Sequence, residues 1–445
     1  MLNLKEFEIL KKESNEYYYR FTIQAKERPM VCPNCLWDED FEEERFIIHS
    51  TKERQVIDTP IHGKPVILIL KHTRYKCPCC KKTFYQHFFS IERNCKITLR
   101  LKEYIQKQAL KKPFSRIAED TNLSPTIVKK YFKEKIKELD KERTLIAPKV
   151  LGIDEAHLNN KMRGVFTDTE NNKLIEITED NLKRTVKETI TSMKGYENIE
   201  VVTIDMWSGY KYACKEVIPQ ATIVVDKFHV IQYAIRALED MRKNIKSNLD
   251  KAERKLLTND RWVLLKNKED LTYNEKILRD SWFNRFPNLG KAYWLKEGIR
   301  DIYDAGDRYT AFVMFHEWEK SIPDNFKAFK ELQKTYNNNK QEIFNYFLEP
   351  YTNAYTESIN NVIKTVEKEG KGYSYDVLRA KVLYSTRATK RPKIEDVNFV
   401  EFNKRFGHVE QRNHKHIIEG FEVDLNELKY ILNEGGLNGT VREND

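Results

Sequence analysis

Three short runs rich in β-branched residues constrain the fold of this chain most, because each run ends in an aspartate. They are Val150-Leu-Gly-Ile-Asp154, Val201-Val-Thr-Ile-Asp205 and Ile223-Val-Val-Asp226. Each run has the length of a buried strand and is too short for a buried helix. One aspartate at a strand end is ordinary turn chemistry, but three so close in sequence indicate a cluster. Because hard cations take oxygen ligands, carboxylates gathered at neighbouring strand ends suit magnesium.

Composition favours a soluble, folded protein of several domains. The chain has 445 residues, of which 40% are hydrophobic and 33% are charged. This apolar content supports packed cores and excludes a disordered chain. The longest aliphatic run, residues 66–70, is far too short to span a membrane, and the first residues contain no apolar signal core. We therefore expect a cytoplasmic protein without a membrane partner.

The cysteines predict a zinc site near the N-terminus. Five of the seven lie between Cys32 and Cys80, and four of them form the pairs Cys32-Pro-Asn-Cys35 and Cys77-Pro-Cys-Cys80. Four thiolates in two such pairs make a tetrahedral zinc site. A redox motif would explain one pair but not two. Since four thiolates close the coordination shell, we expect one structural Zn²⁺ that supports DNA docking and performs no catalysis.

A basic segment follows the cysteines and has the pattern of a helix-turn-helix. Residues 96–143 hold 14 Lys and Arg against 7 Asp and Glu, an excess typical of a polyanion site, although a solvated helical surface is the plain alternative. Ser124 is a suitable N-cap and Pro125 a suitable first residue for the second helix. We expect the first helix to bury Ile117 and Ala118, and the second to bury Ile127, Val128 and Tyr131. The residues left to face DNA are Thr126, Lys129 and Lys130.

The aspartate runs belong to a longer alternation of strands and helices. Strands are expected at 150–157, 163–168, 174–178, 199–205 and 221–226, with helices at 182–194 and 208–217. This β-β-β-α-β-α-β order is that of a ribonuclease H-like α/β fold. In that fold the first and fourth strands are neighbours at the centre of the sheet. Asp154 and Asp205 should then face one another, with Asp226 one strand further out.

A later helix offers a third acidic ligand. In the stretch 352–364, polar residues recur at spacings of three and four, which places them on one helix face. An amphipathic surface helix is the plain alternative, but a face with an acid, amides and a base suits contact with both metal and phosphodiester. The residues on this face are Asn353, Glu357, Asn360, Asn361 and Lys364.

Together these motifs resemble the DDE transposases of bacterial insertion sequences, in particular the ISL-three family. The matching stretches are GIDE at 152–155, IPQATIVVDKFHV at 218–230 and NAYTESINNVIK at 353–364. The resemblance spans roughly residues 30–390. It implies a zinc element, a helix-turn-helix and a ribonuclease H-like core interrupted by an all-helical insertion.

The resemblance also implies roles for individual residues. Asp154 and Glu357 match the first and last members of the catalytic triad, and the middle carboxylate is Asp205 or Asp226. Strand order favours Asp205, because the fourth strand usually carries this residue. Asp226 and His229 then resemble an Asp-x-x-His element, with His229 in a supporting role. The triad would bind two Mg²⁺ (or Mn²⁺) ions, and Asn360, Asn361 and Lys364 would position DNA phosphates.

The expected domain limits follow from these motifs. They are a zinc-binding domain at 1–92, a helix-turn-helix domain at 93–147, the first part of the core at 148–235, a helical insertion at 236–345, the final core helices at 346–392 and an extension at 393–445.

The implied activity is metal-dependent cleavage and strand transfer of an insertion sequence. The partners would be transposon-end and target double-stranded DNA, bound by a homodimer or a larger assembly. Two alternatives remain, a zinc-ribbon and helix-turn-helix regulator that is not an enzyme, and an inactive, domesticated transposase.

Overall fold

The computed structural model describes residues 2–36, 46–92, 95–385, 415–418 and 421–424. The chain forms two units, Met1–Lys390 and Arg391–Asp445. In the second unit, β11 (Lys415–Ile418) pairs antiparallel with β12 (Phe421–Asp424). The rest of the expected extension at 393–445 lies outside the described residues. Among the helices that the structure describes, none has the length and apolar character needed to cross a membrane.

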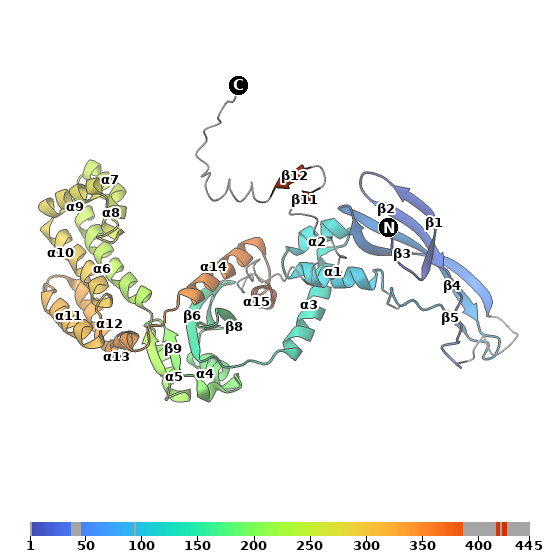
Figure 1. Cartoon of the computed structure of the whole chain (residues 1–445), viewed down its shortest axis with the longest axis horizontal. Helices are drawn as coiled ribbons and strands as arrows, with labels where there is room; N and C mark the ends of the chain where they lie inside the picture. The colour runs from blue at the N-terminus through green and yellow to red at the C-terminus, as the bar shows by residue number, and fades with distance from the viewer. Residues whose placement is uncertain (1, 37–45, 93–94, 386–414, 419–420, 425–445) are drawn as a thin grey trace, which may run out of the picture. The chain divides into compact units, whose positions relative to one another are not determined.

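A five-stranded sheet forms the N-terminal part of the first unit (Figure 1). Its strands are β1 (Phe7–Ser14), β2 (Tyr19–Ala25), β3 (Ile47–Ile61), β4 (Lys64–Lys76) and β5 (Thr83–Tyr85), in the order β1-β2-β4-β3 with β5 on β4. The long β3–β4 hairpin turns at His62 and Gly63, which both have positive φ, as a tight hairpin turn requires.

Three helices follow the sheet: α1 (Leu99–Ala109), α2 (Phe114–Thr121) and α3 (Pro125–Glu142). The turn between α2 and α3 has the expected chemistry, with Asn122 in the left-handed conformation and the Ser124 side chain accepting a hydrogen bond from the Ile127 amide. One expected core position is wrong, because Ile127 is 38% exposed and Phe132 is buried instead. Val128 and Phe132 are four residues apart and share one face of α3, whereas Ile127 is rotated away from it.

The second sheet is mixed and has the strand order β10-β9-β6-β7-β8. Its strands are β6 (Val150–Leu158), β7 (Lys161–Asp168), β8 (Lys173–Ile177), β9 (Val201–Ile204) and β10 (Thr222–Val225). The first three are antiparallel neighbours, whereas β9 and β10 run parallel to β6. Asn159 and Asn160, both with positive φ, form the β6–β7 turn.

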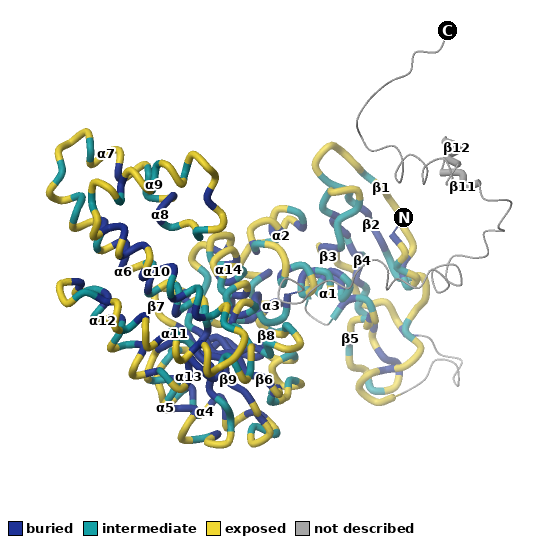
Figure 2. The backbone as a smooth tube through the Cα atoms, turned by 60° about the vertical axis from the view of Figure 1, so that its left-hand side comes forward, coloured by how far each residue is buried: buried dark blue, intermediate teal, exposed yellow. Residues whose placement is uncertain are grey.

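Helices cover both faces of this sheet, so its strands are almost entirely buried (Figure 2). On one face, α4 (Lys183–Ser192) and α5 (Ser208–Val217) pack on odd-numbered residues of β6 such as Ile153. On the other, α14 (Ala354–Glu369) and α15 (Tyr375–Leu383) pack on even-numbered residues such as Ala156. The side chain of Asp154 therefore belongs to the face that α14 covers.

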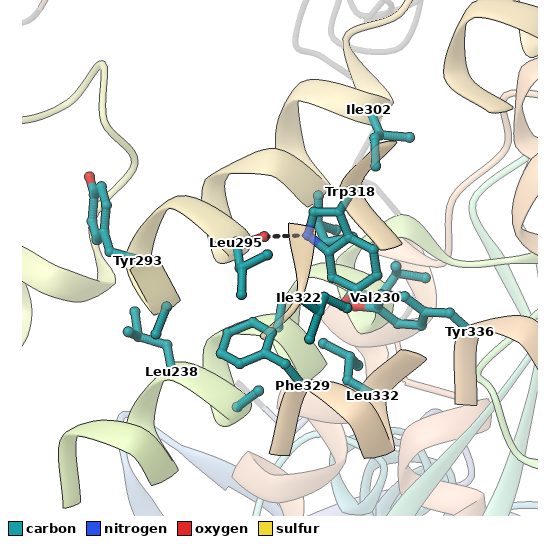
Figure 3. Close-up of a cluster of buried hydrophobic side chains, with 14 of the residues drawn as sticks. Val230, Leu238, Tyr293, Leu295, Ile302, Trp318, Ile322, Phe329, Leu332 and Tyr336 are labelled. Atoms are coloured by element: carbon teal, nitrogen blue, oxygen red, sulfur yellow. Dashed lines mark hydrogen bonds between the residues drawn. The ribbon is translucent and has the colours of Figure 1, made fainter. Parts of the chain in front are cut away.

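A helical region separates β10 from α14. Two short 3₁₀ turns complete the list of helical elements: η2 (Tyr196–Asn198) precedes β9, and η3 (Asn345–Phe347) precedes α14. The helical region itself comprises α6 (Lys227–Ser247), α7 (Lys251–Asn259), α8 (Arg261–Leu265), α9 (Tyr273–Arg285), α10 (Pro287–Tyr303), α11 (Arg308–Ser321), α12 (Lys327–Asn338) and α13 (Lys340–Phe344). Its core contains Trp318, whose indole N–H donates to the Leu295 carbonyl at 2.8 Å (Figure 3). The expected boundary between residues 235 and 236 falls inside α6, which begins directly after β10.

Candidate active site

The three strand-end aspartates lie level with one another across three adjacent parallel strands. In the β6–β9 pairing Gly152 is opposite Thr203, and in the β9–β10 pairing Ile204 is opposite Val225. Continuing these offsets past the paired residues brings Asp154, Asp205 and Asp226 to the same level. Since side chains in register on parallel strands point to the same face, all three belong to the face that α14 covers.

Asp154 is the most central of the three, because its strand β6 also pairs with β7. The residue is 4% exposed. Its Oδ2 accepts a hydrogen bond from the Asn360 amide at 2.8 Å, and its Oδ1 lies 4.0 Å from Nε2 of His229. Burial, with Asp205 and Glu357 nearby, raises the pKa of this carboxyl to about 6. The nearby hydrogen-bond donors and His229 therefore do not offset the burial of this carboxylate in the protein alone.

Asp205 follows the last residue of β9 and is held by its own turn. Its Oδ1 accepts a hydrogen bond from the backbone N–H of Trp207 at 2.9 Å. Partial burial raises the pKa of the carboxyl. The next helix, α5, begins at Ser208, so the positive end of a helix dipole lies beside the carboxylate.

Asp226 joins His229 and Glu357 in a compact group. One ligand atom from each of the three residues lies within 4.8 Å of the others. Among the described residues, neither oxygen of the fully buried Asp226 nor Nε2 of His229 meets a hydrogen-bond partner. Burial raises the pKa of Asp226. A buried carboxylate without a donor is costly, and a bound cation would offset that cost, so the donor set fits a divalent metal.

The first turn of α14, which carries Glu357, is fastened to the sheet by a buried amide. Asn353 donates to the Ile153 carbonyl at 3.0 Å, and its Oδ1 accepts from the hydroxyl of Thr203 at 2.9 Å. A Cβ on Gly152 would lie 2.7 Å from the same Oδ1. The glycine in the GIDE stretch is therefore needed for the close approach of α14.

The other polar residues of α14 divide between the site and solvent. Asn360 is half-buried and contacts Asp154, so it positions a carboxylate in this structure. Asn361 and Lys364 are exposed on the outer side of the helix. Only the latter two are therefore open to phosphates without rearrangement.

The four expected zinc ligands come together. Sγ of Cys32 lies 3.8 Å from that of Cys80, and Sγ of Cys35 lies 3.7 Å from that of Cys77. A tetrahedral Zn²⁺ with bonds of about 2.3 Å requires sulfur separations of about 3.8 Å, so the geometry fits zinc. Burial raises the pKa of the Cys77 thiol to about 12, as expected for a thiol without its metal. Cys79 is exposed and stands outside the four-cysteine group.

The expected DNA-facing residues of the helix-turn-helix lie at the start of α3. Thr126 and Lys130 are exposed and Lys129 is half-buried. Lys130 Nζ lies 3.9 Å from Glu134, a pair that is too exposed to hold the side chain firmly. These residues remain free to reach DNA.

The sequence did not predict the contacts that Tyr373, between α14 and α15, and Lys381, on α15, make with the helix-turn-helix domain. The backbone N–H of Phe114, at the start of α2, donates to the hydroxyl of Tyr373 at 2.7 Å. The buried ammonium of Lys381 on α15 donates to the carbonyl of Ala109, the last residue of α1, and to that of Lys112 in the turn before α2. No local sequence signal marks these contacts, because the partners are more than 250 residues apart.

Comparisons with known proteins agree with this domain order. A family profile described as "zinc-finger of transposase IS204/IS1001/IS1096/IS1165" matches residues 28–80, and a "Helix-turn-helix domain of transposase family ISL3" matches residues 90–134. The ISL3 profile described as "Transposase" matches residues 151–382, just over half of the chain.

A curated relative agrees with the profiles. The "Transposase for insertion sequence element IS1001" of Bordetella parapertussis is 22% identical over 334 residues, which are 73% of this chain and 82% of that protein. A zinc ribbon, a helix-turn-helix and a transposase domain with a mixed sheet thus follow one another, and the zinc ribbon with its four cysteines supports a structural zinc. The chain therefore belongs to the ISL3 family and is a transposase with a DNA-binding helix-turn-helix domain.

Proposed function

We propose that this transposase has a ribonuclease H-like catalytic core whose carboxylates bind two Mg²⁺ (or Mn²⁺) ions and cleave DNA at the ends of an insertion sequence. The observation that carries the proposal is the level row of Asp154, Asp205 and Asp226, with Glu357 brought to it by α14. The strand order supports the fold, because the first strand, β6, is central and pairs with the fourth, β9.

The proposed triad is Asp154, Asp205 and Glu357. Asp154 and Asp205 stand level on neighbouring strands, and Glu357 interacts electrostatically with Asp154. Asp226 is the alternative middle ligand, supported by its proximity to His229 and Glu357. In the favoured arrangement Asp226 and His229 form a supporting pair beside the triad.

The residues of the site have distinct tasks in this proposal. Asn360 orients Asp154, and Asn353 keeps Glu357 on the sheet. Bound magnesium supplies the Lewis acidity that activates a water or a DNA 3′-hydroxyl and stabilises the leaving oxygen. Asn361 and Lys364, on the exposed side of α14, contact the phosphates that flank the scissile bond.

The other domains select the DNA. The helix-turn-helix, through Thr126, Lys129 and Lys130, and the zinc ribbon bind the terminal inverted repeats. Joining two ends to one target requires two active sites, so the protein acts as a homodimer or a larger assembly on transposon-end and target DNA.

Cleavage of a labelled transposon-end duplex in Mg²⁺ tests this proposal. Asp154→Ala should lower the cleavage rate by about 1,000-fold or more, because it removes a proposed ligand of the metal ions. It should leave end binding within about twofold, because α3 lies outside the site. Asp240→Ala, which removes an exposed carboxylate from α6, is the matched control. Cleavage by Asp154→Ala at the wild-type rate would exclude the proposed site.

A further inference from the structure

Two exposed aromatic side chains stand at equivalent positions beside the carboxylate row. Trp207 follows Asp205 by two residues, and Phe228 follows Asp226 by two residues. Each aromatic stands where the chain leaves its strand for the next helix: Trp207 directly precedes α5, and Phe228 is the second residue of α6. Trp207 is 37% exposed and Phe228 is 41% exposed. Each therefore presents apolar surface to solvent at the edge where buried carboxylates must meet their substrate.

The Trp207 ring is held in place. Its backbone N–H donates to Asp205, and its ring packs edge-to-face on Tyr210 with centroids 4.6 Å apart. The ring also lies across Gly209, where a Cβ would come within 2.3 Å of it. A large aromatic group whose backbone is hydrogen-bonded, whose ring packs on two neighbours and which is still open to solvent loses little entropy when it stacks on a ligand.

Phe228 lies on the first turn of α6, next to positive charge. Nζ of Lys227 is 5.7 Å from the centre of its ring and is hydrogen-bonded to the Tyr346 hydroxyl at 3.0 Å. An aromatic face beside a lysine matches a nucleotide, which offers a flat base and an anionic phosphate.

The burial of the carboxylates explains why an aromatic platform is useful. Stacking of the bases keeps the backbone of a regular duplex on a regular helical path, from which a phosphate cannot easily reach a residue that is only 4% exposed, as Asp154 is. Unstacking a base next to the scissile phosphate would let the backbone bend toward the site, at an energetic cost that a protein recovers by stacking the freed base on its own rings.

We propose that Trp207 stacks on a base that is unpaired next to the scissile phosphate of the transposon end, and that Phe228 offers the DNA a second aromatic surface. This inference rests on the proposed active site, because it assumes that DNA is cleaved at the carboxylate row. Trp207 is a positioning residue in this account, since it contacts the DNA strand and not the reacting atoms.

The test uses the full-length protein, Mg²⁺ and end duplexes with 2-aminopurine placed in turn at each nucleotide near the cleavage site. In the wild type, one position should change its fluorescence on binding as its base leaves the helix and stacks on the ring. Trp207→Ala should abolish that change and slow single-turnover cleavage about tenfold to a hundredfold, the usual effect of losing one base–aromatic contact. Trp207→Phe should retain most of the rate. Trp262→Ala, which removes a 66% exposed tryptophan from α8, is the control and should behave as wild type.

An abasic substrate separates stacking from a structural role. With the base removed at the responding position, Trp207 has no partner, so wild type and Trp207→Ala should cleave at similar rates. If Trp207→Ala slows cleavage by the same factor on intact and abasic duplexes, the inference is overturned. It is also overturned if no 2-aminopurine position responds in the wild-type complex. If wild type cleaves in Mg²⁺ and Trp207→Ala cleaves equally fast, this inference alone fails. If wild type does not cleave at all, the proposed function fails first.

Discussion

The side-chain amide of Asn353 donates a hydrogen bond to the backbone carbonyl of Ile153 at 3.0 Å, and so joins the start of α14 to the residue before Asp154. The Oδ1 atom of Asn353 accepts from the hydroxyls of Thr203 and Thr356 at 2.9 Å each. One buried amide thus links β6, β9 and α14. The position of Glu357, four residues further along α14, depends on this link.

Gly152→Ala should disturb this link. The added methyl carbon would lie 2.5 Å from Thr167 Oγ1 and 2.7 Å from Asn353 Oδ1, so α14 must move outward. We expect a loss of about 1–3 kcal/mol in the free energy of unfolding, as for other overpacked cores, and slower DNA cleavage as Glu357 shifts. Urea unfolding and single-turnover cleavage measure the two effects. Gly306→Ala is the control, because its Cβ would meet no atom within 4 Å; equal stability of the two variants would contradict the account.

The raised pKa of Asp154 predicts a pH-dependent stability in the absence of metal. Burial moves this pKa from 3.8 to about 6, so between these pH values the folded state binds a proton that the unfolded state does not. Through this one carboxyl, the metal-free protein should lose up to about 3 kcal/mol of stability as the pH rises through this range. Asp154→Asn should remove this loss and be more stable than wild type at pH 8. The exposed control Asp240→Asn should follow the wild-type curve of stability against pH. If the curve of Asp154→Asn ran parallel to that of the wild type, the prediction would be wrong.

Zinc binding should require the four converging cysteines and not Cys79, the fifth cysteine of this region. Cys77→Ser removes one of four converging thiols, so native mass spectrometry should find one zinc per chain in wild type and none in the variant. Cys79→Ser should keep its zinc, because Cys79 stands outside the group. Retention of zinc by Cys77→Ser would show that a different ligand set holds the metal.

Tyr373→Phe should loosen the helix-turn-helix from the segment between α14 and α15. The change leaves the Phe114 amide without its acceptor at the start of α2, a loss worth about 1–3 kcal/mol for a buried donor. We expect faster hydrogen exchange in α1 and α2 with little change in β6 and β9. Tyr309→Phe, at a position that is 77% exposed, should leave exchange unchanged. Unaltered exchange in Tyr373→Phe would show that the contact does not hold the domain.

Local chemistry made part of this molecule predictable from its sequence. The zinc cysteines, the Ser124 cap and the aspartates at strand ends depend on spacing within a few residues. The level arrangement of Asp154 and Asp205 required a strand order, which the alternation of strands and helices supplied. The exposure of Ile127 was not predicted, because the pattern did not show that Val128 and Phe132 would form the buried face of α3 and leave Ile127 outside it.

Contacts between residues far apart in the chain could not be predicted from the sequence. Asn353 could be assigned to a polar helix face, but its burial depends on two strands that are 150 and 200 residues away. Lys381 reads as a surface charge, yet it is 5% exposed and binds the carbonyl of Ala109 at the end of α1. Polar side chains of this kind are buried only when distant backbone groups meet them.

The most direct test of the proposed active site is single-turnover cleavage of a transposon-end duplex by Asp205→Asn and Asp226→Asn at saturating protein and Mg²⁺. The proposed triad predicts that Asp205→Asn loses about 1,000-fold or more in rate, whereas Asp226→Asn, which alters a supporting residue, loses about 10- to 100-fold. The reverse order would make Asp226 the middle ligand. Wild-type rates in both variants would contradict catalysis at this row of carboxylates.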